Sequence, residues 1–153
     1  MTDYDALREG LQGAIPFNKH LGLKVEEISE GTGVVCLPDR KTLHNHVGSQ
    51  HAGGLFAAGE AASGAAFISV FAEHMGDVVA LAKSAEIDYR KLAQGRITAT
   101  GTLEKDASEL LDAMDGEEGK AEFPVEVEMK DENGQVVATM TVHWHVRRTA
   151  GGE

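Results

Sequence analysis

One acidic side chain stands alone in the most apolar stretch of the sequence. Between Ala52 and Ala72, Glu60 is the only ionisable residue, and apolar residues fall on every face of the helix that this stretch predicts. An ionised carboxylate in such surroundings is costly unless it is paired or performs chemistry. Burial also raises the pKa of a carboxyl group, which makes Glu60 a candidate general base near neutral pH. The alternative is that Glu60 lies on an exposed strip or pairs with an arginine. From the residues alone, the catalytic and the structural interpretations are equally supported.

A polar loop precedes this helix and ends in two glycines. The stretch 45–54 has the sequence NHVGSQHAGG. Free N–H groups at the start of a helix, with the helix dipole behind them, can stabilise an oxyanion. Gly53 and Gly54 would let a substrate carbonyl approach the backbone closely. A flexible helix cap is the commoner use of such glycines, and it is Glu60, six residues after Gly54, that favours the oxyanion hypothesis.

The order of these groups resembles the active-site segment of a known family. His51 and Glu60 stand nine residues apart and follow the pattern Asn45-x-x-Gly48-x-x-His51, similar to hotdog-fold acyl-CoA thioesterases and especially to their phenylacetate-pathway-like branch. The stretch 85–96, AEIDYRKLAQGR, resembles the strand and turn that follow the helix in that family. The resemblance implies an α+β hotdog fold, in which an antiparallel β-sheet wraps one long central helix. It also implies a homodimer or homotetramer whose active sites form where two chains meet.

Carried over by position, the resemblance implies a role for each polar residue of this segment. Glu60 matches the catalytic acid, Asn45 a polar residue near the thioester or the water, His51 the histidine that opens the helix, and Gly53 a glycine of the oxyanion region. An alanine follows His51 where His-Gly-Gly is common, so which N–H would face the oxyanion stays open. The implied reaction is hydrolysis of an acyl-CoA thioester, with Glu60 acting as general base or as nucleophile. No cofactor is expected beyond the coenzyme A of the substrate.

The substrate would need further contacts outside this segment. Coenzyme A phosphates require cations, and Arg90, Lys91 and Arg96 are the nearest candidates at a strand end, although such side chains more commonly solvate a surface. Large apolar residues at helical spacing could line an acyl pocket or simply form core. They are Phe56, Phe67, Phe71 and Met75.

Other interpretations keep the pocket but change the chemistry. A non-catalytic acyl-CoA or fatty-acyl binding protein would reuse the same fold, but it has no need for a lone carboxylate beside the thioester. Zinc could bind to the His-x-His pairs at 44/46 and 143/145, each of which points to one face of a strand. However, the motif H-E-x-x-H is absent, so surface or core histidines explain the pairs better and no metal is expected. The sequence also lacks Gly-x-Ser-x-Gly and the glycine motifs of phosphate-binding loops.

Hydrophobic periodicity predicts the elements that must hold these residues. Leu7, Leu11 and Ile15 recur every four residues and indicate an amphipathic helix within 1–20, which Pro16 helps to end. The remaining elements are a hairpin in 23–37, a loop in 39–50, the long helix 51–75, strands in 78–89, 96–103, 121–130 and 136–148, and a short acidic helix at 107–114. The pair Asn133-Gly134 predicts a tight turn between the last two strands.

Small residues give the long helix a narrow waist. Of the 14 residues from Gly53 to Ala66, 11 are Gly, Ala or Ser. A glycine costs about 1 kcal/mol in a helix interior relative to alanine. Gly59 and Gly64 therefore predict that a neighbouring element packs unusually close to the helix at both positions.

Length and composition limit the partners and the compartment. The chain of 153 residues, 42% hydrophobic and 25% charged, predicts one globular domain over 1–153 with a flexible tail at 149–153. A formal charge of −11 argues against binding to nucleic acid or to anionic membranes. The N-terminus lacks a signal pattern, and the charge-free apolar stretch 61–72 is shorter than the ~20 residues of a membrane span. Because the single cysteine, Cys36, can form no internal disulfide, a cytoplasmic location fits best.

Overall fold

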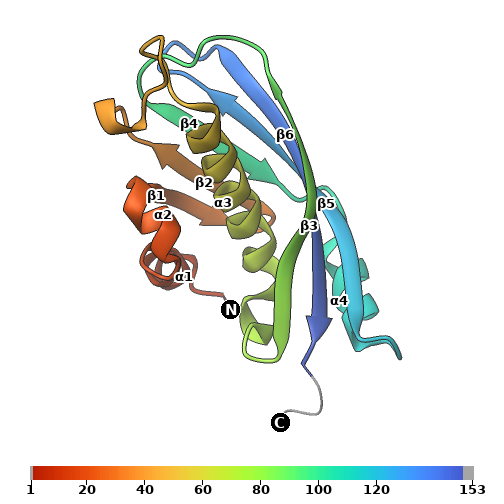
Figure 1. The fold of residues 1–153 in the computed structure, drawn as a ribbon. Coiled ribbons are helices and arrows are strands. Elements are labelled where there is room, and N and C mark those ends of the chain that lie inside the picture. The colour runs from red at the N-terminus through yellow and green to blue at the C-terminus, as the bar shows by residue number, and fades with distance from the viewer. Residues whose placement is uncertain (1, 150–153) are drawn as a thin grey trace.

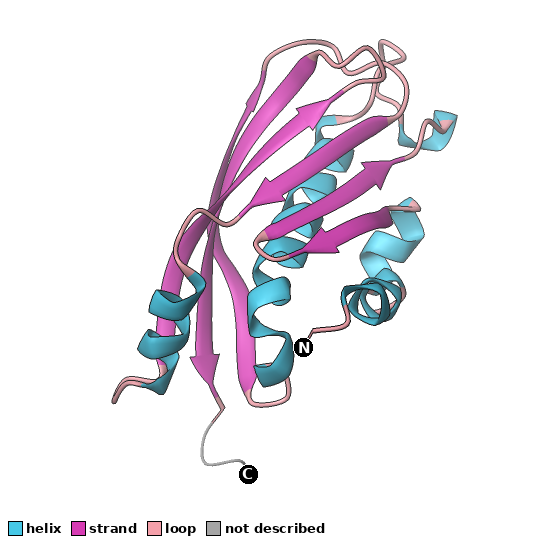
Figure 2. Cartoon of the chain, turned by 180° about the vertical axis from the view of Figure 1, so that it is seen from behind, coloured by secondary structure: helices cyan, strands magenta, loops and turns pink. Residues whose placement is uncertain are grey.

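One long helix and one antiparallel sheet form the centre of the fold. The computed structural model describes residues 2–149, so 150–153 of the predicted tail lie outside the described residues. One face of the sheet packs against helix α3 (Ala52–Phe71), as Figures 1 and 2 show from opposite sides. The strands are β1 (Lys24–Ser29), β2 (Thr32–Leu37), β3 (Val78–Tyr89), β4 (Ile97–Thr102), β5 (Lys120–Lys130) and β6 (Val136–Arg148). They lie in the order β1-β2-β4-β5-β6-β3, and each neighbouring pair is antiparallel, which confirms the predicted α+β hotdog architecture.

Two short helices replace the single helix predicted near the N-terminus. The first, α1 (Tyr4–Gln12), is capped by Asp3, and the second, α2 (Pro16–Leu21), begins at the proline. The expectation that Pro16 helps to end the first helix is therefore wrong, because α1 already ends at Gln12, with Gly13 as its C-cap, and Pro16 starts α2 instead. Proline suits a first helical position, where its missing N–H is not needed and its fixed φ is already helical. Both helices lie beside β1 and α3 (Figure 1).

The narrow waist of α3 lets two strands approach its backbone directly. A Cβ built on Gly33 of β2 would lie 2.5 Å from the Ala65 Cβ. A Cβ on Gly101 of β4 would lie 2.6 Å from the carbonyl oxygen of Ala62. The side chains of both strand and helix must therefore be small where the two cross. This close contact explains the run of small residues in α3.

The two helix glycines singled out in the sequence differ in their surroundings. A Cβ on Gly59 would lie 2.5 Å from Met140 Sδ, so a neighbour does pack closely there. A Cβ on Gly64 would meet nothing nearer than Trp144, at 3.7 Å. The expectation is thus right for Gly59 and wrong for Gly64, where the neighbouring side chains lie at ordinary contact distance.

Alternation along the last strands buries one face of the sheet under α3. Along β5, every second side chain from Ala121 to Met129 is buried and those between them are exposed, as the pattern predicts. Phe67 and Phe71 of α3 pack with Phe123 and Trp144 of these strands, and the Phe67 and Trp144 ring centroids are 4.6 Å apart. These rings anchor the C-terminal half of α3 to the sheet.

The connections follow the sequence with two differences. The loop predicted in 39–50 contains a short 3₁₀ turn, Lys41–Leu43, and a second such turn, Ala72–His74, extends α3. Between β5 and β6, only Gly134 takes a positive φ, of 79°, and the Asp131 side chain accepts the N–H groups of Asn133 and Gln135. The tight turn expected at this point is therefore a longer loop.

The acidic helix α4 (Ala107–Asp115) forms as predicted and is capped by Asp106.

The stretch Ala52–His74 is also long and apolar enough to cross a membrane by composition alone. However, 67% of its most apolar window is buried within the fold. That burial is the setting of a core helix rather than of a membrane span.

Candidate active site

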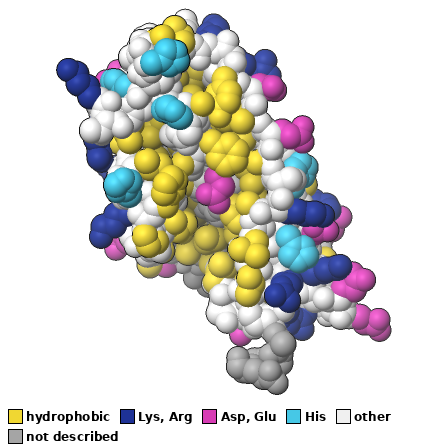
Figure 3. Space-filling view, in the orientation of Figure 1, with side chains coloured by type: hydrophobic (Ala, Val, Ile, Leu, Met, Phe, Trp, Pro, Cys, Tyr) yellow, Lys and Arg dark blue, Asp and Glu magenta, His cyan; other side chains and the backbone are white. Residues whose placement is uncertain are grey.

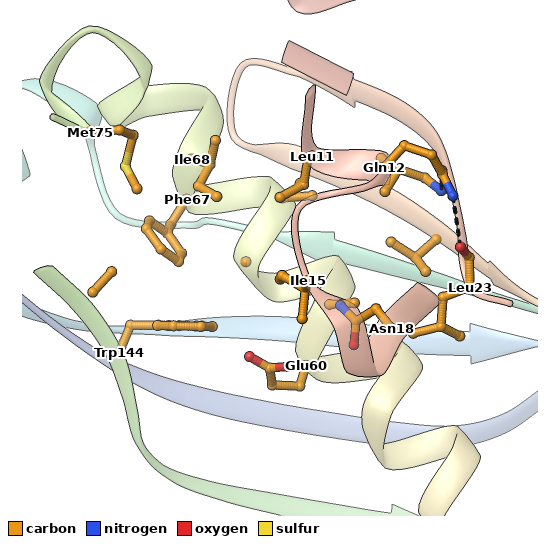
Figure 4. A pocket seen from close by; sticks show the side chains of 16 residues that line it. Leu11, Gln12, Ile15, Asn18, Leu23, Glu60, Phe67, Ile68, Met75 and Trp144 are labelled. Atoms are coloured by element: carbon orange, nitrogen blue, oxygen red, sulfur yellow. Dashed lines mark hydrogen bonds between the residues drawn. The ribbon is translucent and has the colours of Figure 1, made fainter. Parts of the chain in front are cut away.

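Glu60 lines a cavity between α3 and the two N-terminal helices. The cavity has a volume of about 170 Å³. Its walls come from α1, α2, α3 and the strands β1, β2, β3 and β6, together with residues between these elements such as Ile15 and Met75. Figure 3 shows an acidic side chain in a hollow surrounded by apolar side chains on this face, and Figure 4 shows the Glu60 carboxylate among the lining residues.

The carboxylate of Glu60 has an unusual electrostatic setting. The residue is half-buried, and desolvation by burial raises the pKa of its carboxyl group above the ordinary value of 4.5. Its carboxylate oxygens form no ion pair or hydrogen bond with any other residue in 2–149. The arginine partner considered from the sequence is thus not present. A carboxylate with a raised pKa and no partner is a stronger base than an exposed one and is free to accept a proton.

A buried hydrogen-bond chain fixes the helix turn that carries Glu60. The Trp144 indole N–H donates to Ser63 Oγ at 2.9 Å, and the Ser63 hydroxyl donates to the Glu60 carbonyl oxygen at 2.7 Å. Because Trp144 belongs to β6, this chain ties the sheet to α3 one turn beyond Glu60. The indole also forms a wall of the cavity.

The roof of the cavity is held by the last residue of α1. Gln12 Nε2 donates to the Leu23 carbonyl oxygen at 3.0 Å, and Gln12 Oε1 accepts the Val25 N–H at 2.7 Å. One bond reaches Val25 of β1 and the other reaches Leu23, just before this strand, so they pin the end of α1 beside the sheet edge. Ile15 and Asn18 follow in the chain and complete the roof over the cavity (Figure 4).

The start of α3 offers a different N–H group from those predicted. His51 Nδ1 accepts the Gly53 N–H at 2.8 Å, and the Gly54 N–H donates to the His51 carbonyl oxygen at 3.0 Å. The two glycine N–H groups are therefore already used within the chain. The Ala52 N–H has no hydrogen-bond acceptor in residues 2–149. The Ala52 carbonyl oxygen accepts a hydrogen bond from the Tyr89 hydroxyl at 3.1 Å. Because His51 Nδ1 accepts, its remaining proton is on Nε2.

Asn45 organises the loop that precedes α3. Its Oδ1 accepts the N–H groups of Val47 and Ser49, both at 3.0 Å, and its Nδ2 donates to Ser49 Oγ at 2.8 Å. Such bonds are those of an Asx turn, which shapes a loop. The role of Asn45 near the thioester stays a prediction.

Within one chain, the predicted site residues form two separate groups. Asn45, His51, Gly53 and Gly54 lie at or before the start of α3, and none of them lines the cavity at Glu60. Glu60 follows Ala52 by eight residues, which is roughly 12 Å along a helix axis. A general base must come within hydrogen-bond reach of the proton that it removes. The two groups of one chain therefore do not meet at one thioester.

The predicted substrate contacts also lie outside the cavity. Arg90 Nε donates to Thr139 Oγ1 at 3.1 Å, and Arg96 is paired with Glu26. Lys91 is exposed beside Arg90. Phe56 is 38% exposed on the surface of α3. Of the large apolar residues considered for an acyl pocket, Phe67 and Met75 line the cavity, whereas Phe71 and Phe56 do not.

The histidine pairs have acidic neighbours but form no metal cluster. Among residues 2–149, no three His, Cys, Asp or Glu side chains lie together as metal ligands would. His44 Nε2 lies 2.7 Å from Asp39 Oδ1, and His145 Nδ1 lies 3.3 Å from Glu122 Oε2.

Several cavity residues were not found from the sequence. Trp144 lies in the strand predicted at 136–148, but no local pattern pairs it with Ser63, a residue 81 positions earlier. Asn18 and Gln12 carried no signal of their own. Leu11 and Ile15 belong to the apolar positions of the predicted N-terminal helix. An apolar helix face must pack against something, and this is the sequence feature that could have predicted that the segment covers the cavity.

One family model and several solved structures match this chain. The family model described as "Domain of unknown function (DUF4442)" matches residues 5–146. A solved structure from Pseudomonas aeruginosa, described as a protein of unknown function and probable thioesterase, is 30% identical, with a TM-score of 0.80 over 94% of this chain and 95% of that chain. No curated protein matches the sequence.

Two more distant structures share the fold. The PaaI protein from the phenylacetic acid degradation operon of E. coli is 21% identical, with a TM-score of 0.68 over 96% of this chain and 91% of that chain. A thioesterase family protein from Silicibacter pomeroyi is 18% identical, with a TM-score of 0.76 over 95% of this chain and 99% of that chain.

Proposed function

The chain belongs to the DUF4442 family and to the hotdog-fold thioesterase superfamily, and on that premise we propose that it hydrolyses acyl-CoA thioesters. The observation that carries the proposal is Glu60. Its carboxylate is half-buried in an apolar cavity without a partner in residues 2–149, and burial raises its pKa. A structural carboxylate would be paired, and a protein that only binds acyl groups gains nothing from this one.

Glu60 can act on the thioester in two ways. As a general base it takes a proton from water while the water oxygen attacks the thioester carbonyl carbon. As a nucleophile it attacks that carbon itself and forms a mixed anhydride, which water then hydrolyses. In both routes the C–S bond breaks, the coenzyme A sulfur leaves and takes a proton, and the products are a carboxylic acid and free coenzyme A.

The oxyanion of the tetrahedral intermediate needs a hydrogen-bond donor, and within one chain the candidate donor does not lie near Glu60. The Ala52 N–H at the start of α3 is a suitable donor, but it lies roughly 12 Å along the helix axis from Glu60. We therefore assign the two parts of one site to two chains, Glu60 of one and the α3 start of the other. A homodimer is then the working unit, while the homotetramer that the resemblance also implies stays a prediction.

The edge strand β3 is the surface that we assign to this pairing. It is bonded only to β6 in the described sheet, and it exposes apolar side chains, with Leu81 63% exposed. An unpaired edge with exposed apolar residues is a template for another strand. Arg90 and Lys91 follow directly after this strand and lie near the start of α3, because the hydroxyl of Tyr89, the last strand residue, donates to the Ala52 carbonyl oxygen. We assign the coenzyme A phosphates to these two cations, since the charge of Arg96 is paired with Glu26, whereas Arg90 donates to a neutral hydroxyl, that of Thr139.

The deciding experiment measures release of free coenzyme A from short, medium, long and aromatic acyl-CoAs. Wild type is compared with Glu60→Ala, Asn45→Ala and, as a matched control, Glu73→Ala, which removes an exposed glutamate just beyond α3. We expect Glu60→Ala to lose a factor of about 10²–10⁴ in kcat, the usual contribution of a general base. Equal turnover in Glu60→Ala and wild type would overturn the assignment. Binding without turnover across the whole panel would favour the acyl-CoA binding protein instead.

A further inference from the structure

Resting on the proposed hydrolysis, we infer that the cavity at Glu60 is the acyl site and that it takes a neutral, apolar acyl group of about six carbon atoms beyond the carbonyl. Gly64 sets the length of that group. The inference concerns the substrate class and a residue that selects it, and it draws on the volume, the lining and the charge of the cavity.

The cavity follows one face of α3 away from Glu60. Glu60, Gly64 and Ile68 are spaced by four residues and so lie along the same side of the helix, over roughly 12 Å. All three line the cavity, and Met75 lines it beyond the end of α3. Trp144 and Ile15 flank this path from opposite elements, β6 and the α1–α2 connection (Figure 4). A thioester carbonyl held at Glu60 would thus direct its acyl chain toward Met75.

The volume limits the group that fits. A cavity of about 150 Å³ lined by aliphatic and aromatic side chains binds a benzene molecule, which has six carbons. The cavity at Glu60 measures about 170 Å³, which admits an acyl group of similar bulk. A long fatty-acyl chain would have to displace the roof that Gln12 pins to β1.

The lining selects against charge. Glu60 is the single charged residue among those that line the cavity. Both polar atoms of the Gln12 amide are already bonded to the backbone, at Leu23 and Val25, and the further amide side chain in the lining, Asn18, is neutral. An acyl group with a second carboxylate would be buried without a cation and near an acidic side chain, which is costly. A neutral hydrocarbon group meets no such penalty.

Gly64 lines the cavity without a side chain of its own. A Cβ on this residue would lie 3.7 Å from Trp144 Cζ2 and 3.9 Å from Trp144 Cη2, which are ordinary contact distances. Gly64→Ala is therefore tolerated by the fold but places a methyl group in the acyl path. The variant should shorten the accepted chain by about one carbon, since a methyl group occupies the space of one methylene.

The test uses Trp144 as the reporter, because it is the only tryptophan of the chain and lies in the cavity wall. A series of S-alkyl coenzyme A thioethers with 2 to 14 alkyl carbons is titrated against the protein while its fluorescence is recorded. We expect the affinity to rise about fourfold per methylene, or about 0.8 kcal/mol, and to level off about six carbons beyond the carbon that replaces the carbonyl. Gly64→Ala should level off about one carbon earlier. Gly10→Ala, an equivalent helix substitution with no atom within 4 Å of the new Cβ, should match wild type.

The outcomes separate this inference from the proposed function. Thioethers are not hydrolysed, so the binding series stands whether or not the protein releases coenzyme A from thioesters. Affinity that continues to rise to 14 carbons, an unchanged Trp144 emission, or identical profiles for Gly64→Ala and wild type would each overturn the acyl assignment. The expected chain-length limit without any turnover of thioesters would support the acyl site and overturn the hydrolysis.

Discussion

Replacing Glu60 with glutamine should make the protein less active and more stable at the same time. Glutamine keeps the shape of a protonated glutamate but can neither accept a proton as a base nor attack a thioester. We expect kcat to fall by about 10²–10⁴, as for the loss of a general base. The gain in stability follows from the cavity, because glutamine removes a charge that burial disfavours.

The sign of the pH dependence follows from the direction of the pKa change. Burial raises the pKa of Glu60 in the folded state above its ordinary value of 4.5. The stability that the protonated carboxyl group contributes is fully present below that value and is lost as the pH rises through the higher folded-state pKa. Wild type and Glu60→Gln should therefore be equally stable at low pH and diverge above about pH 4.5. The activity of wild type should rise with pH over the range in which the folded carboxyl group ionises.

The size of the effect can be checked by thermal unfolding. Relieving a functionally strained residue commonly adds about 0.5–2 kcal/mol to the free energy of unfolding. For a chain of this length each kcal/mol raises Tm by about 2–4 °C, so the expected gain at pH 8 is about 1–8 °C. Glu73→Gln, at an exposed glutamate, should leave both Tm and kcat unchanged. A lower Tm for Glu60→Gln, or a difference that does not vary with pH, would refute the view that this carboxylate is buried without a partner.

Three further changes test the elements that position the site. Gly101→Ala should lower the free energy of unfolding by about 1–3 kcal/mol in a urea titration, because its Cβ would lie 2.6 Å from the Ala62 carbonyl oxygen and the helix backbone cannot yield cheaply. A variant as stable as wild type would contradict the direct contact of β4 with α3. Ser63→Ala should cost about 1–3 kcal/mol and change the fluorescence of Trp144, whose indole N–H would lose its buried acceptor. Gln12→Ala removes the two bonds that tie α1 to Leu23 and Val25, so amide hydrogen exchange in α1 should become faster, and unchanged exchange would show that the roof is held by other contacts.

Local patterns were enough to predict most of the scaffold. The alternation along β5 and β6 and the run of small residues in α3 each follow from contacts that repeat along one element. The error at Pro16 has a local cause as well, because proline is compatible both with the end of one helix and with the first residue of the next. The error at Gly64 is different, since a glycine in a helix can face either a very close neighbour or one at ordinary contact distance, and only the tertiary structure distinguishes these cases.

Glu60 could be predicted as a candidate because its signal is the absence of other charges around it in the sequence. Its surroundings could not, because they come from distant parts of the chain. Trp144 reaches Ser63 across 81 positions, and the roof depends on a glutamine in α1 that bonds to β1. Neither residue type is unusual where it occurs, so only the folded arrangement shows that they enclose the carboxylate.

The length of α3 between Glu60 and Ala52 links the proposed reaction to the proposed homodimer. A base and an oxyanion donor must both contact the same thioester, but Glu60 and the free N–H of Ala52 are separated by eight residues of one rigid helix. No loop movement within the chain can shorten that distance while α3 remains helical. If both groups act in one reaction, they must come from two copies of α3, and an exposed edge strand such as β3 provides the surface on which two copies can meet. A chain that cannot dimerise should accordingly keep its acyl cavity and lose its turnover.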